Sequence, residues 1–137
     1  MDLFATGPWR LFPIDVAHWF GWAGGAMLAV SAAYSALKRG FPSRVRLWLT
    51  IHCIPGIVSL LLASIHLANR LFFARPEHLL SFFTFGLMVV IVVGGIMERY
   101  ASRPRVIREY WRTLHVPLTV IFYLTLSIHV LVKMGML

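Results

Sequence analysis

Four long apolar segments separated by short polar turns dominate the hydrophobic pattern of this chain. The segments contain no Lys, Arg, Asp or Glu, and they cover residues 16–37, 47–68, 79–97 and 113–132. Each is long enough to cross a hydrocarbon core about 30 Å thick as an α-helix. We therefore predict helices over about residues 14–37, 46–69, 79–99 and 112–133.

Residues that break helices mark the turns between these segments. Gly40 and Pro42 follow the first segment, Pro76 lies in the second turn, and Pro104 lies in the third. Because such short connections force neighbouring helices to run antiparallel, the pattern predicts an all-α, up-and-down four-helix bundle in the membrane. Residues 1–137 then form a single domain. In such a bundle the second and fourth helices run in the same direction.

The composition agrees with a membrane protein. Hydrophobic residues make up 59% of the chain and charged residues 13%, and the mean hydropathy is +0.77. The acidic start, Met1-Asp2-Leu3, and the length of the first apolar segment do not fit a cleavable signal peptide, so we expect an uncleaved anchor. The single cysteine, Cys53, cannot form a disulfide within the chain.

The net charge of +8 is explained best by membrane topology. Nine of the 13 Lys and Arg residues lie at the first and third turns: Lys38, Arg39, Arg44, Arg46, Arg99, Arg103, Arg105, Arg108 and Arg112. Both turns lie on the same side of an up-and-down bundle, and the positive-inside rule makes that side cytoplasmic. Both termini then lie on the outer side of a cytoplasmic or equivalent energy-conserving membrane. This distribution argues against nucleic-acid binding and favours some attraction for anionic lipid.

Four of the six histidines form two pairs of identical spacing. His52 and His66 lie in the second segment, His115 and His129 lie in the fourth, and each pair is 14 residues apart. Fourteen residues are about four helical turns, so both side chains of a pair point the same way to within about 40° and lie about 21 Å apart along the axis. On parallel helices, His52 pairs with His115 near the inner face, and His66 pairs with His129 near the outer face.

Histidines within a membrane are functional candidates because an imidazole in hydrocarbon is costly without a partner. A zinc or copper site needs three or four converging ligands, and the spacing separates the two levels too widely for one such site. Two imidazoles at each level are what six-coordinate haem iron requires. We therefore predict that His52 and His115 ligate an inner iron, and that His66 and His129 ligate an outer one.

Other polar and small residues are candidates to support these ligands. Nearby hydroxyls that could bond the imidazoles are those of Thr50, Ser59, Ser64, Thr119, Thr125 and Ser127. Glycines that allow close packing, of a haem or of the helices themselves, are Gly21, Gly24, Gly25, Gly56, Gly86, Gly94 and Gly95. His18 and His78 are read either as interfacial polar groups or as groups near haem propionates or a quinone.

The arrangement of His52, His66, His115 and His129 resembles the di-haem cytochrome b family. It is similar to the haem-bearing bundle of quinol:cytochrome c reductases and to the membrane domains of ferric reductases and NADPH oxidases. The resemblance implies two b-type haems. In a second variant, similar to the membrane subunits of formate dehydrogenases and hydrogenases and to cytochromes b561, His18 replaces one outer ligand.

The expected function is electron transfer across the membrane. The chain has no flavin- or nicotinamide-binding domain, so it is expected to be an electron-transfer subunit of an oxidoreductase complex rather than a complete enzyme. Quinone or redox proteins at either face are the expected partners. The alternatives are a self-contained quinol, superoxide or ferric oxidoreductase, and a haem-free structural subunit or transporter whose histidines bridge helices.

Overall fold

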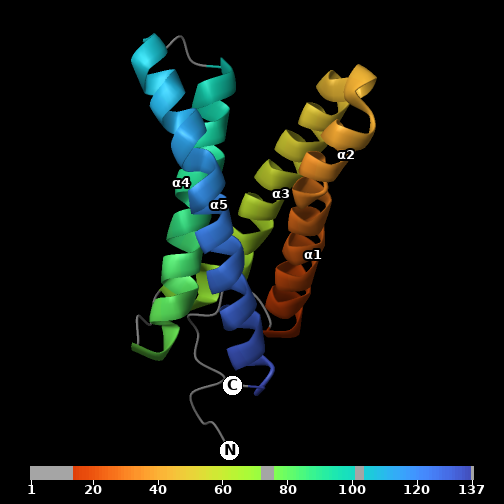
Figure 1. The fold of residues 1–137 in the computed structure, drawn as a ribbon. Coiled ribbons are helices and arrows are strands. Elements are labelled where there is room, and N and C mark those ends of the chain that lie inside the picture. Colours follow the sequence, from red (N-terminus) through yellow and green to blue (C-terminus); the bar gives the residue numbers. More distant parts are fainter. Residues whose placement is uncertain (1–13, 72–75, 101–103, 137) are drawn as a thin grey trace, which may run out of the picture. The chain divides into compact units, whose positions relative to one another are not determined.

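The computed structural model describes residues 14–71, 76–100 and 104–136, and the regular elements in these ranges are all helices. Arg103, named above at the third turn, lies outside the described residues, as do Met1, Asp2 and Leu3. The helices in chain order are α1 (Ile14–Ala32), α2 (Tyr34–Gly40), η2 (Pro42–Arg44), α3 (Val45–Leu71), η3 (Pro76–His78), α4 (Leu79–Tyr100) and α5 (Arg105–Lys133) (Figure 1).

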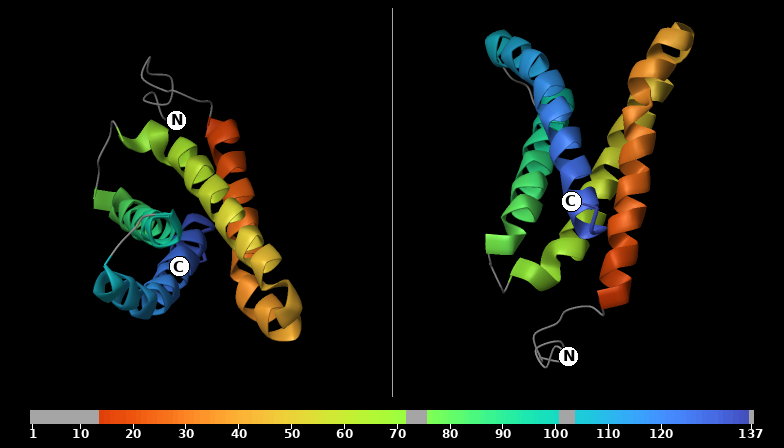
Figure 2. Two further views of the ribbon diagram at one scale, coloured as in Figure 1. Left: turned by 90° about the horizontal axis from the view of Figure 1, so that it is seen from above. Right: turned by 60° about the horizontal axis from the view of Figure 1, so that its bottom comes forward.

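The chain forms two compact units, Met1–Pro76 and Glu77–Leu137. In the first, α1 and α2 run antiparallel to α3, and in the second, α4 runs antiparallel to α5 (Figure 2). We call these units the first and second hairpins. In each, the end that carries the basic connection between its helices is called the basic end, and the opposite one the far end. The prediction that residues 1–137 form one four-helix domain stays a prediction.

The predicted all-helical class with four long apolar helices is confirmed. Four segments in the described residues are long and apolar enough to cross a membrane: Val16–Gly40, Pro42–Ala68, Leu79–Tyr100 and Arg108–Lys133. Many of their large apolar side chains face outward, as Trp19, Leu61 and Val116 do with exposures of 75%, 61% and 65%. An apolar exterior fits an integral membrane protein.

The first predicted helix is divided in two. We expected one helix over about residues 14–37, whereas α1 ends at Ala32 and α2 begins at Tyr34. At the break, the Ala33 N–H is shared between the carbonyl oxygens of Ala29 and Val30, both at 3.2 Å. Such shared bonds are common at helix ends. No glycine or proline lies at this point, so the sequence carried no local signal for the break.

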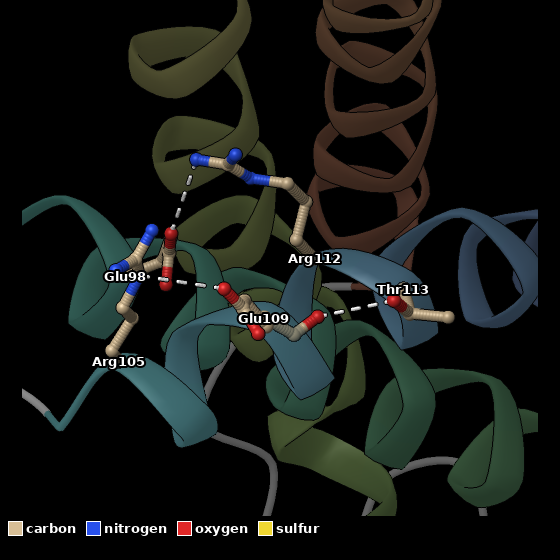
Figure 3. A network of polar contacts seen from close by, with 5 residues as sticks. All are labelled: Glu98, Arg105, Glu109, Arg112 and Thr113. Carbon is tan, nitrogen blue, oxygen red and sulfur yellow. Dashed lines mark hydrogen bonds and ion pairs between the residues drawn. The ribbon is translucent and has the colours of Figure 1, made fainter.

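The fourth helix begins earlier than predicted, at Arg105 rather than near residue 112. Pro104 precedes it with a φ of −53° and a ψ of 142°, and proline is well suited to a helix start because it lacks an N–H to satisfy. The extra turns are polar. They carry an Arg105–Glu109 ion pair of 3.6 Å, and Arg112 reaches Glu98 of α4 at 3.8 Å (Figure 3).

Residues buried against the neighbouring helix follow a seven-residue repeat. Seven of the nine buried residues in the described ranges lie on it: Ala17, Gly24, Ser31, Ser59, Ser81, Met88 and Phe122. Seven residues fall only about 20° short of two full helical turns. Positions seven apart therefore form one stripe along the face of their own helix. Most are small, which lets membrane helices pack closely. The two histidine pairs lie on the same stripes, as described next.

Candidate functional site

In the first hairpin, α1 and α3 meet in three layers that are seven residues apart on both helices. At the far end, His66 Nδ1 lies 2.6 Å from the carbonyl oxygen of Ala17. In the middle, the Ser59 hydroxyl donates to the carbonyl of Gly24 at 2.7 Å. At the basic end, His52 faces Ser31. Each step forward along α1 is thus matched by an equal step back along α3, and both histidines face the partner helix.

At the basic end of this hairpin, three contacts join Ser31 and His52. His52 Nδ1 lies 3.0 Å from the Ser31 carbonyl oxygen and 3.0 Å from the Ser31 hydroxyl. The same hydroxyl donates to the His52 carbonyl at 2.9 Å. The ring of Tyr34, at the start of α2, lies 5.0 Å from the His52 ring between centroids. The break between α1 and α2 therefore lies directly against this histidine.

The second hairpin repeats the same register. At its far end, His129 Nδ1 lies 3.3 Å from the Ser81 hydroxyl. In the middle, Met88 of α4 and Phe122 of α5 are both buried, each with 3% exposure. At the basic end, a Cβ added to Gly95 would lie 3.9 Å from Cε1 of His115. The three layers are again seven residues apart on each helix.

The hydrogen bonds in the first hairpin fix which ring nitrogen carries the proton. A carbonyl oxygen can only accept, so an Nδ1 atom within bonding distance of one must be the donor. His52 and His66 both meet this condition, at 3.0 and 2.6 Å. In a neutral imidazole, Nε2 then holds the lone pair. This is the arrangement of a metal-binding histidine, whose other nitrogen donates to a backbone or carboxylate oxygen.

The hydroxyls expected to bond the imidazoles donate to backbone carbonyls instead. Thr50, Ser64, Thr119, Thr125 and Ser127 each donate to a carbonyl of their own helix three or four residues earlier. Ser59 crosses to α1 but bonds Gly24. The hydroxyls that contact imidazoles are those of Ser31 and Ser81, which lie on the preceding helices. Residues 17, 24 and 31 are small and seven apart, but this spacing does not show which of them meets an imidazole of another helix.

The predicted glycines fall into two groups. Those that face a side chain of the partner helix include Gly21, where an added Cβ would lie 2.9 Å from Nδ1 of His66, and Gly94, where an added Cβ would overlap the Trp111 ring. Gly24, Gly56 and Gly95 also face the partner helix at larger distances. An added Cβ at Gly25 or Gly86 would meet nothing within 4 Å. Close helix packing therefore accounts for the first group.

The remaining candidates lie beside the histidine layers or away from them. The exposed His18 has its ring centroid 6.1 Å from that of His66. His78 belongs to η3 and is half-buried, and Cys53 is half-buried beside His52 on α3. His52 and His115 belong to different hairpins, as do His66 and His129. The pairing of ligands across the two hairpins therefore stays a prediction.

The residues present fit a haem better than a small metal centre. Among the described residues, no group of three or more His, Cys, Asp or Glu side chains is placed to hold a metal ion. One histidine of each pair lies at each end of its hairpin instead. Nδ1 of His52 and of His66 is within bonding distance of a carbonyl, so Nε2 would be the atom that ligates an iron. Single imidazoles held in this way suit axial ligation of a porphyrin iron.

Comparison of the chain with protein-family models, with curated proteins and with solved structures finds no match.

Proposed function

We propose that this chain is a di-haem membrane cytochrome b that carries electrons across a bilayer. The observation that supports this most is the shared register of the two hairpins. Each places one histidine at its basic end and one at its far end, on the stripe that packs against the neighbouring helix. Three of the four have Nδ1 at a carbonyl or hydroxyl of that helix. A purely structural role of the histidines would not require the same three layers in both hairpins.

In this proposal, His52 and His115 hold the inner haem, and His66 and His129 hold the outer one. When bound, a bis-histidine haem supplies reversible one-electron transfer between ferric and ferrous iron. The chain fixes the ligand geometry by binding Nδ1 of His52 and His66 to carbonyls of α1. A spacing of about 21 Å along each helix gives one level near each membrane face.

The proposal includes the family and the topology inferred from the sequence. The chain would resemble the haem-bearing bundle of quinol:cytochrome c reductases, with its basic turns in the cytoplasm and both termini outside. In this proposal it exchanges electrons with quinone or with redox proteins at the two faces, as one subunit of a larger complex. The four exposed apolar helices support the bilayer as its surroundings.

The test is a visible spectrum of the purified chain in detergent, with pyridine haemochrome quantification. We expect Soret and α bands and two b haems per chain. A spectrum without these bands, in protein whose helical content is intact by circular dichroism, would overturn the proposal and favour a structural subunit or transporter. Turnover of quinol, superoxide or ferric iron by the chain alone would instead identify a self-contained oxidoreductase.

A further inference from the structure

The proton positions between Ser31 and His52 are determined by two carbonyl oxygens. Because the Ser31 hydroxyl lies 2.9 Å from the His52 carbonyl, its hydrogen points to that acceptor. Toward His52 Nδ1, which lies 3.0 Å away, the Ser31 hydroxyl oxygen can therefore act only as an acceptor. Nδ1 also lies 3.0 Å from the Ser31 carbonyl. The Nδ1–H of His52 is therefore shared between two acceptors of a single residue.

The break between α1 and α2 places Ser31 where its own backbone carbonyl is available as an acceptor. Ser31 is second from the end of α1, and carbonyls in the last turn of a helix lack partners within it. The carbonyls of Ala29 and Val30 accept from the N–H of Ala33. The carbonyl of Ser31 accepts from the imidazole of the opposite helix. With 6% exposure, the Ser31 side chain is shielded, which strengthens both contacts.

The contacts of the other imidazoles involve different groups. His66 Nδ1 lies 2.6 Å from the carbonyl oxygen of Ala17, a residue with no polar side chain. Ser81 meets His129 through its hydroxyl at the longer distance of 3.3 Å. The Ser31 side chain lies 3.0 Å from an imidazole nitrogen while its own hydrogen is directed to a carbonyl.

We propose that Ser31 is a positioning residue that holds His52 as the Nδ1–H tautomer and lowers the reduction potential of the haem bound by His52. This inference rests on the proposed function. Each acceptor of Nδ1–H gives the ring more imidazolate character, which raises its basicity and stabilises ferric over ferrous iron. Outer-shell partners of this kind commonly change metal affinity at least tenfold.

The test is a redox titration of the Soret and α bands in Ser31→Ala. Because the Ser31 carbonyl still accepts from Nδ1, we expect a partial effect. The ferric/ferrous equilibrium of one haem should shift toward ferrous by up to about tenfold, equivalent to about 59 mV for one electron. The potential of the other haem should stay as in the wild type, and Ser31→Thr, which keeps a hydroxyl, should have a potential close to that of the wild type.

Ser59→Ala is the matched control. It removes another buried serine hydroxyl that bonds a carbonyl of α1, but that carbonyl belongs to Gly24 and no imidazole is involved. A merely structural role of Ser31 predicts similar small changes in both variants. Two bound haems with unchanged potentials in Ser31→Ala would overturn the inference and leave the proposed function standing. Equal shifts in Ser31→Ala and Ser59→Ala would overturn it as well.

A second measurement needs no haem and reads the ring nitrogens of the wild-type chain, with one variant used only to assign the signals. ¹⁵N NMR of the haem-free chain, with histidine labelled and His52 assigned by comparison with His52→Gln, reports which ring nitrogen carries the proton. We expect Nδ1–H for His52. Nε2–H in the wild type would overturn the inference even if the chain binds two haems. If the wild type binds no haem, the proposed function fails, and this measurement still decides the tautomer.

Discussion

The two hairpins share one register but fill it with different chemistry. In the first, the middle layer is a serine hydroxyl bonded to a glycine carbonyl, Ser59 to Gly24, at 2.7 Å. In the second, the same layer holds two large apolar side chains, Met88 and Phe122, each with 3% exposure. The end layers differ less, since both hairpins place a histidine there. What is kept between the hairpins is therefore the position of the histidines, and what varies is the packing between them.

This difference indicates that the two hairpins are stabilised in different ways. In lipid, helices associate through close packing and interhelical hydrogen bonds, because hydrocarbon chains are as apolar as leucine. The first hairpin uses small residues and hydrogen bonds to α1 carbonyls. The second depends more on filled volume around Phe122 and on the indole of Trp111 against Gly94. Substitutions at matched layers should therefore separate the contributions of haem ligation and helix packing.

Removal of one ligand should have the largest effect. In the proposed function, His129→Ala would deprive the outer iron of one of its two imidazoles, and we expect the haem content to fall from two per chain to one by pyridine haemochrome analysis. His18→Ala is the matched control and should retain two haems. If His18→Ala loses the outer haem while His129→Ala keeps it, the variant in which His18 is a ligand is correct.

The middle layers should respond unequally to truncation. Phe122→Ala removes a buried aromatic side chain and should lower the free energy of unfolding by about 3–5 kcal/mol. Ser59→Ala, at the equivalent layer of the first hairpin, removes one hydrogen bond and should cost about 1 kcal/mol. Unfolding in mixed detergent micelles, followed by circular dichroism, measures both. Equal losses of unfolding free energy in the two variants would contradict the difference in packing between the two layers.

The contact between Gly94 and Trp111 predicts a smaller loss within the second hairpin. A Cβ at residue 94 would overlap the Trp111 ring, so Gly94→Ala must displace a side chain whose centroid lies 6.0 Å from that of His115. Overpacking of this kind typically costs about 1–3 kcal/mol. The control is Gly86→Ala on the same helix, where the added Cβ meets nothing within 4 Å. Unfolding midpoints that fall equally in both variants would contradict the contact.

The smallest effect is expected at Gly21. An added Cβ would lie 2.9 Å from Nδ1 and 3.0 Å from Cε1 of His66, so the ring must shift by a few tenths of an ångström. Gly21→Ala should thus broaden or shift the bands of the outer haem, with both haems retained. Gly25→Ala, four residues further along α1, adds the same methyl group in open space. Identical spectra of Gly21→Ala and wild type would contradict the close approach of α1 to His66.

The sequence predicted the helices well because their apolar segments are long and their turns contain Gly or Pro. The third helix, for example, ends within one residue of its predicted boundary at 99. The break at Ala33 was not predicted because no residue there disfavours helix; in the structure it lies beside the contact of Ser31 with His52. The early start of α5 was missed because charged residues there were assigned to a turn.

The histidine pairs were visible in the sequence, whereas their supporting residues were not. Equal spacing within a helix is a local property, so His52 and His66 could be grouped directly. Ser31 and Ser81 lie on other helices, and their contacts depend on the register between helices, which one sequence does not reveal. Hydroxyls near the histidines in sequence, such as Thr119, bond their own backbone instead, as serine and threonine commonly do in helices.

The most direct test of the account is a redox titration of four single-ligand variants, His52→Ala, His115→Ala, His66→Ala and His129→Ala. The account predicts loss of the same redox component in the first two, and loss of the other component in the last two, because each haem takes one imidazole from each hairpin. Loss of one component in both His52→Ala and His66→Ala, with the other lost in both His115→Ala and His129→Ala, would contradict it.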